Sequence, residues 1–170
     1  MNISLIGYMG CGKSTIGKEI SDITGLKFID LDSYISSKEQ MSINEIFSKK
    51  GEVYFRKIEK KYLHEILNLE SIVLSLGGGT PVYYDNIETI NNKSCSFYLK
   101  LSPKELAHRL MKEKEHRPLI SRIEDQNLEE FIAKHIFERF PYYERAKYKI
   151  NGNQDVPTIV NEIIDITKPS

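Results

Sequence analysis

The sequence lacks several features that would place a protein in other functional classes. It has no net charge, because 24 lysines and arginines are matched by 24 aspartates and glutamates among its 170 residues. Such a chain has no overall field that would attract nucleic acid or an anionic membrane. It has only two cysteines, Cys11 and Cys95, whose positions suggest neither a disulfide framework nor a metal site. No apolar run approaches the ~20 residues of a membrane span.

These absences favour a small cytoplasmic protein. The residues before Cys11 include no basic segment and are too few for an export signal. We therefore expect a soluble monomer that binds neither nucleic acid nor membrane and works in the cytoplasm. A chain of this length can bury roughly 70% of its unfolded surface around one core. We expect a single domain over residues 1–170.

The most informative segment lies near the start of the chain. Residues 7–15 read Gly-Tyr-Met-Gly-Cys-Gly-Lys-Ser-Thr and match the phosphate-binding pattern of two glycines separated by four residues and followed by lysine and serine. Glycine lets backbone N–H groups approach a polyphosphate closely. Lys13 would bring a charge to the outer phosphates, and Ser14 would ligate Mg²⁺. The sequence thus predicts a nucleoside triphosphate site between an apolar strand and a helix.

Two aspartates, Asp30 and Asp32, come at the end of the next predicted strand. Side chains two residues apart on an extended chain share one face, so both carboxylates should point the same way. They could serve Mg²⁺ and the incoming nucleophile beside the phosphate loop. Alternatively, Asp32 could cap the helix that follows it, and both roles can hold at once.

A longer helix is predicted over residues 52–69, after a break at Gly51. Its buried stripe is expected to hold Phe55, Ile58, Tyr62, Ile66 and Leu69. Arg56 lies beside this stripe. Taken without other information, it is best interpreted as one half of an intrahelical pair with Glu52 or Glu59.

Two later segments could also approach a ligand. Three glycines at 77–79 follow a buried strand, and their N–H groups could face a ligand, although a flexible turn is the plainer interpretation. Residues 113–124 are rich in charge and are expected to be mobile. They could be a solvated loop, or a lid that brings Arg117 over a transferring phosphoryl group. A helix from Asn127 should kink or end at Pro141.

The predicted strands alternate with helices, which indicates an α/β fold with a parallel sheet covered on both faces. The strands are expected at 2–6, 27–31, 72–76, 95–100 and 147–150. Ligands of such sheets bind at the carboxyl ends of the strands. The phosphate loop, the two aspartates and the three glycines all follow such ends, so they should form one site.

The ordered set of motifs resembles the shikimate kinase family, a member of the nucleoside monophosphate kinase-like group of P-loop proteins. The motifs occupy residues 7–14, 30–32, 51–59, 76–79, 117–119 and 139–143. The resemblance implies a three-layer P-loop kinase fold with a five-stranded parallel sheet, a substrate-binding region over about 32–62 and a lid over about 112–126. It also implies Mg²⁺-assisted, ATP-dependent phosphorylation of the 3-hydroxyl of shikimate, on the route to aromatic amino acids.

The resemblance further implies a role for each matching position. Catalysis would fall to Asp32, Lys13 and Arg117. ATP would be bound by Gly10, Cys11, Gly12, Lys13, Ser14, Thr15, Arg109 and Arg117. Shikimate would be bound by Asp32, Arg56, Gly78, Gly79, Arg139, Phe47 and Phe55. Mg²⁺ would be held by Ser14 and by Asp30, directly or through water.

The chain departs from the family pattern in residues 151–155, which offer no arginine to contact adenine. Residues 121–126 are also long and acidic for the family's lid. Two other functions stay open from the sequence: a kinase for another small hydroxylated acid, or a nucleotide-binding regulatory module without catalysis. The presence of Asp32, Arg56 and Arg139 argues against the regulatory module.

Overall fold

The centre of the molecule is a sheet of five parallel strands. The computed structural model describes residues 1–168, without the side chains of His116 and Pro118. The strands are β1 (Ile3–Ile6), β2 (Lys27–Asp30), β3 (Ile72–Ser75), β4 (Cys95–Lys100) and β5 (Tyr148–Asn151). Their order across the sheet is β2-β3-β1-β4-β5, and every neighbouring pair is parallel. This confirms the α/β fold with a five-stranded parallel sheet.

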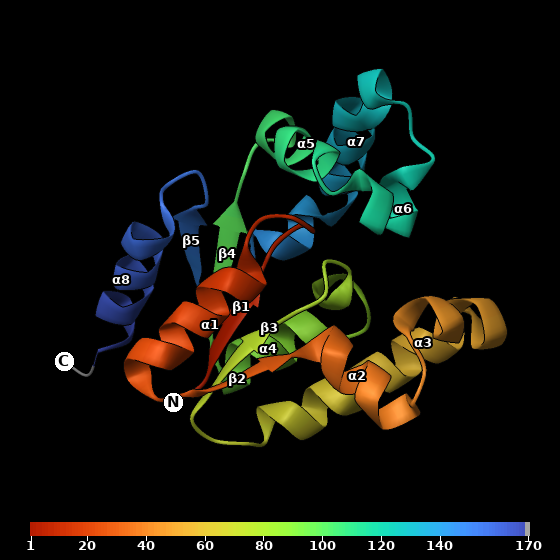
Figure 1. Cartoon of the computed structure of the whole chain (residues 1–170). Helices are drawn as coiled ribbons and strands as arrows, with labels where there is room; N and C mark the ends of the chain where they lie inside the picture. Colours follow the sequence, from red (N-terminus) through yellow and green to blue (C-terminus); the bar gives the residue numbers. More distant parts are fainter. Residues whose placement is uncertain (169–170) are drawn as a thin grey trace.

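Helices cover both faces of the sheet and extend beyond its carboxyl edge (Figure 1). They are α1 (Lys13–Thr24), α2 (Leu31–Glu39), α3 (Ile43–Leu67), α4 (Asn86–Lys93), α5 (Pro103–Met111), α6 (Pro118–Ser121), α7 (Asp125–Tyr143) and α8 (Val156–Thr167). The described residues also form the 3₁₀ turns η1 (Thr80–Val82) and η2 (Lys114–His116). Helices α1 and α8 lie side by side on one face, while α5 to α7 stand beyond the end of β4.

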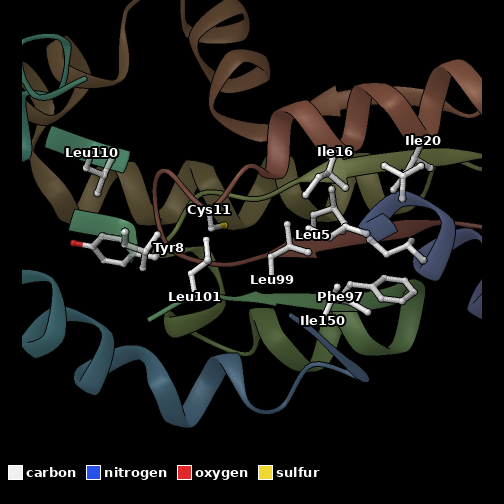
Figure 2. Packing of buried hydrophobic residues seen from close by; sticks show 14 of the residues in the cluster. Leu5, Tyr8, Cys11, Ile16, Ile20, Phe97, Leu99, Leu101, Leu110 and Ile150 are labelled. Carbon is white, nitrogen blue, oxygen red and sulfur yellow. The ribbon is translucent and has the colours of Figure 1, made fainter. Parts of the chain in front are cut away.

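Two apolar clusters, one on each face, hold these layers together. One cluster joins the sheet to α1, α5, α6, α7 and α8, and the other joins it to α2, α3, α4 and the end of α7. Figure 2 shows Ile16 and Ile20 of α1 on one side of Leu5, with Leu99 and Phe97 on the other side. Strands β1 and β3 are buried along their whole length, as expected for a sheet that is covered on both faces.

Local signals fix several helix ends. Gly25 adopts a left-handed φ of 75° and ends α1. Ser42 and Ser102 each form a capping box with the glutamate three residues later. Gly51 interrupts α3 with a φ of 83° and a ψ of 170°, at the predicted break. Among the described residues, no helix is long and apolar enough to cross a membrane.

Some expectations about the elements were wrong or incomplete. Helix α3 ends at Leu67, so Leu69 leaves the buried stripe and is 42% exposed. Helix α7 begins two residues before the expected start and continues through Pro141 to Tyr143. Helix α4 was not predicted, although it places Ile87 and Ile90 in the core. Its eight residues are too few to show a clear helical period.

Candidate active site

The phosphate loop joins β1 to α1 and is shaped by its glycines and Lys13. Gly10 and Gly12 have left-handed φ values of 80° and 96°, which strongly favour glycine. The Lys13 ammonium is buried under the loop and donates to the carbonyl oxygens of Gly7 at 2.8 Å and Tyr8 at 3.0 Å. Gly12 precedes the first turn of α1, whose N–H groups and dipole favour an anion at this end. The loop can therefore bind polyphosphate.

A cavity of about 370 Å³ opens beside this loop. Of the site residues predicted from sequence, it is lined by Gly10, Gly12, Lys13, Ser14, Thr15, Asp30, Asp32, Gly78 and Arg117. The structure thus brings the phosphate loop, the aspartate pair and the glycine segment together, as the strand order predicts. Cys11 differs from its neighbours, because its thiol is buried and lies 3.7 Å from the Lys13 ammonium nitrogen. Only the backbone of Cys11 is suited to contact a phosphate.

The two aspartates face this cavity with different roles. Asp30, rather than Asp32, caps α2, since its Oδ1 accepts from the Ser33 N–H at 3.0 Å. The suggestion that Asp32 forms the cap is therefore wrong. Strand β2 ends at Asp30, and Asp32 lies in the first turn of α2 rather than on extended chain. Even so, both carboxylates line the cavity, and Ser14 Oγ donates to Asp30 Oδ2 at 3.2 Å.

The environment of Asp32 alters its acidity. Burial raises the pKa of Asp32 to about 6, and the nearby carboxylates of Asp30 and Glu59 act in the same direction. Lys13 and Arg56 oppose this rise. A carboxyl with this pKa is mostly ionised at neutral pH but is a stronger base than an ordinary aspartate, which suits proton acceptance.

Arg56 projects from α3 into a setting of aromatic rings and carboxylates. Its Nη1 donates to Glu59 Oε2 at 2.9 Å, and its Nε lies 3.5 Å from Glu52 Oε1. The guanidinium carbon lies 3.9 Å from the centre of the Tyr83 ring. The ring centres of Phe55 and Phe47 lie 5.1 and 5.9 Å from the same guanidinium carbon, and the two ring centres are 4.5 Å apart. The predicted intrahelical pairs of Arg56 are therefore present, but Arg56 also contacts aromatic rings.

Glu59 holds Arg56 in place, and its sequence position predicted no role beyond that pair. Its side chain is 1% exposed, and its other oxygen accepts from Thr80 Oγ1 at 2.7 Å. A buried carboxylate with two donors is a rigid anchor, because both of its oxygens are satisfied. The spacing of three residues between Arg56 and Glu59 was the signal for their pairing. No nearby feature of the sequence indicated that Thr80 would contact Glu59 or that Tyr83 would contact Arg56.

Two of the three glycines after β3, Gly78 and Gly79, make room for arginines. A Cβ on Gly78 would lie 2.8 Å from Nη1 of Arg139, and a Cβ on Gly79 would lie 2.8 Å from Nη2 of Arg56. The Gly78 carbonyl is itself held by the Tyr143 hydroxyl at 2.6 Å. Guanidinium groups from two different helices therefore lie against two consecutive glycines. This clearance is the physical reason for glycine here, and the segment is more than a flexible turn.

Arg117 is at the edge of the cavity and is paired within its own segment. Its Nε and Nη2 donate to Oε2 of Glu113 at 3.0 and 2.7 Å. The segment contains short helical turns, η2 and α6, and Lys114 pairs with Asp125 at 2.6 Å. For Arg117 to act on a phosphoryl group, the pair with Glu113 would have to open or rotate.

Arg109 lies apart from the main cavity. Its Nη2 donates to the Gly152 carbonyl at 3.2 Å, which ties α5 to the turn after β5. It lines a second hollow of about 450 Å³ together with Asn153 and His108. This position is compatible with the edge of a nucleotide base.

Ser14 and Asp30 are the groups suited to Mg²⁺. Among the described residues, no cluster of three or more His, Cys, Asp or Glu side chains could hold a metal. Mg²⁺ in nucleotide sites is commonly bound by one or two protein oxygens together with phosphates and water, so a small ligand set fits it. The serine hydroxyl and the carboxylate lie 3.2 Å apart beside the loop.

The parallel sheet, the phosphate loop between β1 and α1 and the acceptor side chains opposite it define a P-loop kinase for a small molecule. The family model for shikimate kinase matches residues 9–168. A shikimate kinase of Flavobacterium johnsoniae is 44% identical, over 96% of this chain and 97% of the relative. The chain therefore belongs to the shikimate kinase family, whose members phosphorylate shikimate with ATP.

Solved structures agree with this assignment. The crystal structure of shikimate kinase from Bacteroides thetaiotaomicron has a TM-score of 0.93 at 36% identity, covering 98% of this chain and 97% of that one. Shikimate kinase from Acinetobacter baumannii, in complex with shikimate, has a TM-score of 0.87 at 33% identity and covers 97% of this chain and 91% of that one.

Proposed function

We propose that this chain transfers the terminal phosphoryl group of ATP to the 3-hydroxyl of shikimate through one site at the carboxyl edge of the sheet. The arrangement that carries the proposal is the meeting of Arg56 and Arg139 at Gly78 and Gly79, next to Asp32 and the phosphate loop. One side of the site is suited to polyphosphate and the other to a small acid with hydroxyl groups. A kinase for such an acid needs both.

On the nucleotide side, the loop N–H groups from Gly10 to Thr15 would surround the phosphates, and Lys13 would place its charge beside them. Ser14 and Asp30 would hold Mg²⁺, which would neutralise negative charge on the phosphates. Arg109 would lie against the base. Arg117 would turn from Glu113 toward the transferring group, where charge is greatest in the transition state.

On the acceptor side, Arg56 and Arg139 would bind the carboxylate of shikimate. A guanidinium presents two parallel N–H donors that match the two oxygens of a carboxylate. Phe47 and Phe55 would line the pocket against the apolar part of the ring. Glu59 would keep Arg56 oriented without contacting the substrate, because its own oxygens are taken by Arg56 and Thr80.

Asp32 would orient the 3-hydroxyl and accept its proton as the oxygen attacks phosphorus. Its pKa of about 6 leaves it ionised at neutral pH and ready to receive that proton. Phosphoryl transfer requires little covalent work from the protein, so alignment of donor and acceptor matters most. Such alignment can lower a barrier by roughly 7 to 11 kcal/mol.

Water must not replace shikimate as the acceptor. The segment 112–126 would close over the site only when both substrates are present, which keeps water from the phosphoryl group. The proposal includes a monomer that works in the cytoplasm, binding neither nucleic acid nor membrane. It is supported by the balanced charge and by the free thiols of Cys11 and Cys95.

Release of ADP, measured by a coupled assay with several acceptors, tests the proposal. We expect turnover with shikimate, and little with gluconate, with shikimate methyl ester or without an acceptor. The ester keeps every ring hydroxyl but lacks the anion, so it would leave cationic donors without a partner. Equal use of the ester would contradict the carboxylate clamp. Turnover with gluconate alone would show a kinase for another acid, and no turnover would favour a regulatory module.

A further inference from the structure

Tyr8 connects the nucleotide side of the site to the acceptor side, although it lines neither part. Its backbone carbonyl accepts from the Lys13 ammonium at 3.0 Å, so its main chain is part of the phosphate grip. Its side chain is 2% exposed. Figure 2 shows the ring beside Leu110, with its oxygen directed away from the other labelled side chains.

The far end of this side chain meets α7, the helix that carries Arg139. The Tyr8 hydroxyl oxygen lies 2.9 Å from Nδ1 of His135, although the two residues are 127 positions apart in the chain. The two rings meet edge to face, with centres 5.5 Å apart and planes at 81°. The guanidinium carbon of Arg139 lies 5.6 Å from the centre of the Tyr8 ring. Because His135 and Arg139 are four residues apart on one helix, they share its face toward Tyr8.

The protonation states suit a neutral hydrogen bond at this point. Burial raises the pKa of Tyr8 to about 12, so its hydroxyl keeps its proton. Burial lowers the pKa of His135, and the charge of Arg139 lowers it further. A neutral imidazole next to a neutral phenol leaves Arg139 as the cation of this group. The guanidinium, which also lies against the Tyr143 hydroxyl, thus supplies the positive charge that an anionic ligand needs.

A second polar contact of α7 lies close to Arg139. Tyr143, one turn further along α7, donates to the Gly78 carbonyl at 2.6 Å, and Gly78 leaves space for the Arg139 guanidinium. In addition to its apolar packing, the helix therefore has a polar contact through Tyr143 with the glycine segment and one through His135 with the phosphate loop. Any shift of the loop on nucleotide binding would act on the helix through the second point.

We propose that Tyr8 and His135 are positioning residues that couple the phosphate loop to Arg139, so that bound nucleotide favours shikimate binding and the reverse. This inference rests on the proposed function, since it takes Arg139 as a ligand of the shikimate carboxylate. Neither residue is assigned a contact with substrate. The coupling is reciprocal by thermodynamic linkage. Its size is set by one neutral hydrogen bond, which corresponds to a factor of about five in affinity.

Calorimetric titration tests the coupling on the full chain. Shikimate is titrated alone and in the presence of a non-hydrolysable ATP analogue, and the ratio of the two Kd values is compared among variants. We expect a ratio of about five in the unaltered protein. Tyr8→Phe keeps the ring and removes only the hydroxyl, so its ratio should fall toward one. His135→Leu should do the same, whereas His135→Gln, which keeps a polar group, should retain part of the ratio.

The control is Phe137→Leu, at a position that is 82% exposed on the same helix, which should keep the ratio of the unaltered protein. A merely structural role for Tyr8 would lower the melting temperature and leave the ratio unchanged. An unaltered protein with a ratio of one, or a folded Tyr8→Phe with an undiminished ratio, overturns the coupling. If the unaltered protein shows no turnover with shikimate, the proposed function fails instead, and the two failures are distinguishable.

Discussion

Replacing Gly79 by alanine should damage shikimate binding while leaving the fold intact. The added Cβ would lie 2.8 and 2.9 Å from the two terminal nitrogens of Arg56 and 3.2 Å from its guanidinium carbon. The guanidinium would have to move by about 0.6 Å or more to regain ordinary contact. The same Arg56 donates to Glu59 at 2.9 Å and stacks on Tyr83 at 3.9 Å, so a shift disturbs both contacts.

The expected size follows from the hydrogen bonds that would be misaligned. A hydrogen bond to a charged group contributes about 1.5 to 3 kcal/mol, which corresponds to roughly 10- to 150-fold in affinity. We expect the KM for shikimate to rise within that range and the KM for ATP to change much less. The backbone of Gly79 has a φ of −90° and a ψ of −15°, which alanine adopts without strain. Loss of chain freedom in the unfolded state could even stabilise the variant by about 0.4 to 1 kcal/mol.

Steady-state kinetics with each substrate varied in turn, together with thermal melting, provides the measurement. Gly25→Ala is a matched control with the opposite pattern. Its site has open space around it but a φ of 75°, so alanine should cost about 1 to 2 kcal/mol of stability and leave both KM values unchanged. A folded Gly79→Ala with an unaltered KM for shikimate would refute the reasoning, as would an equal rise in both KM values.

Three further predictions concern the other parts of the site. Lys13→Ala should reduce kcat/KM for ATP by about 10² or more, because a charged donor to the phosphates is lost, and near-normal kinetics would contradict the phosphate grip. Asp32→Asn should lower kcat by about 10² or more without lowering the melting temperature at pH 7. Because the pKa of Asp32 is raised, the folded protein binds the proton of this carboxyl more tightly than the unfolded chain does. The wild-type protein therefore loses stability as pH rises from about 4 to about 6. The uncharged amide of Asp32→Asn avoids that loss. For the unaltered protein, kcat/KM should rise through about pH 6, and a flat profile would remove Asp32 as the base. Arg117→Ala should lose mainly kcat, by about 10³, and hydrogen exchange should show residues 112–126 protected only with shikimate and an ATP analogue together. Equal protection in the free protein would exclude a closing lid.

Local patterns were sufficient for much of the fold. The buried strands, the glycine end of α1 and the serine caps of α3 and α5 each depend on residues within a few positions of one another. The alternation of strands and helices then requires a parallel sheet, and its carboxyl edge brings the phosphate loop, Asp30 and Asp32 together. The structure confirms that these segments lie together. This prediction needed only the direction in which each strand runs.

The predictions of helix ends and caps were wrong where the local sequence allowed more than one structure. Asp30 and Asp32 are both able to cap a helix, and the choice of Asp30 follows from where β2 stops. The period of α3 continues to Leu69 in the sequence, but the chain turns away after Leu67 to reach β3. Eight residues of α4 were too short a pattern to identify. Helix ends of this kind depend on packing that begins beyond the pattern itself.

Tertiary structure alone decided how the site is supported. The clearance at Gly78 and Gly79 is needed because α3 and α7 carry their arginines to the same loop. The bond of Glu59 to Thr80 and that of Tyr8 to His135 join residues 21 and 127 positions apart. A single sequence specifies which groups are present, but such contacts depend on how whole helices pack across the end of the sheet. Small changes in helix position decide whether two polar atoms far apart in the sequence come within hydrogen-bond distance. The periodic pattern within one helix does not specify such positions.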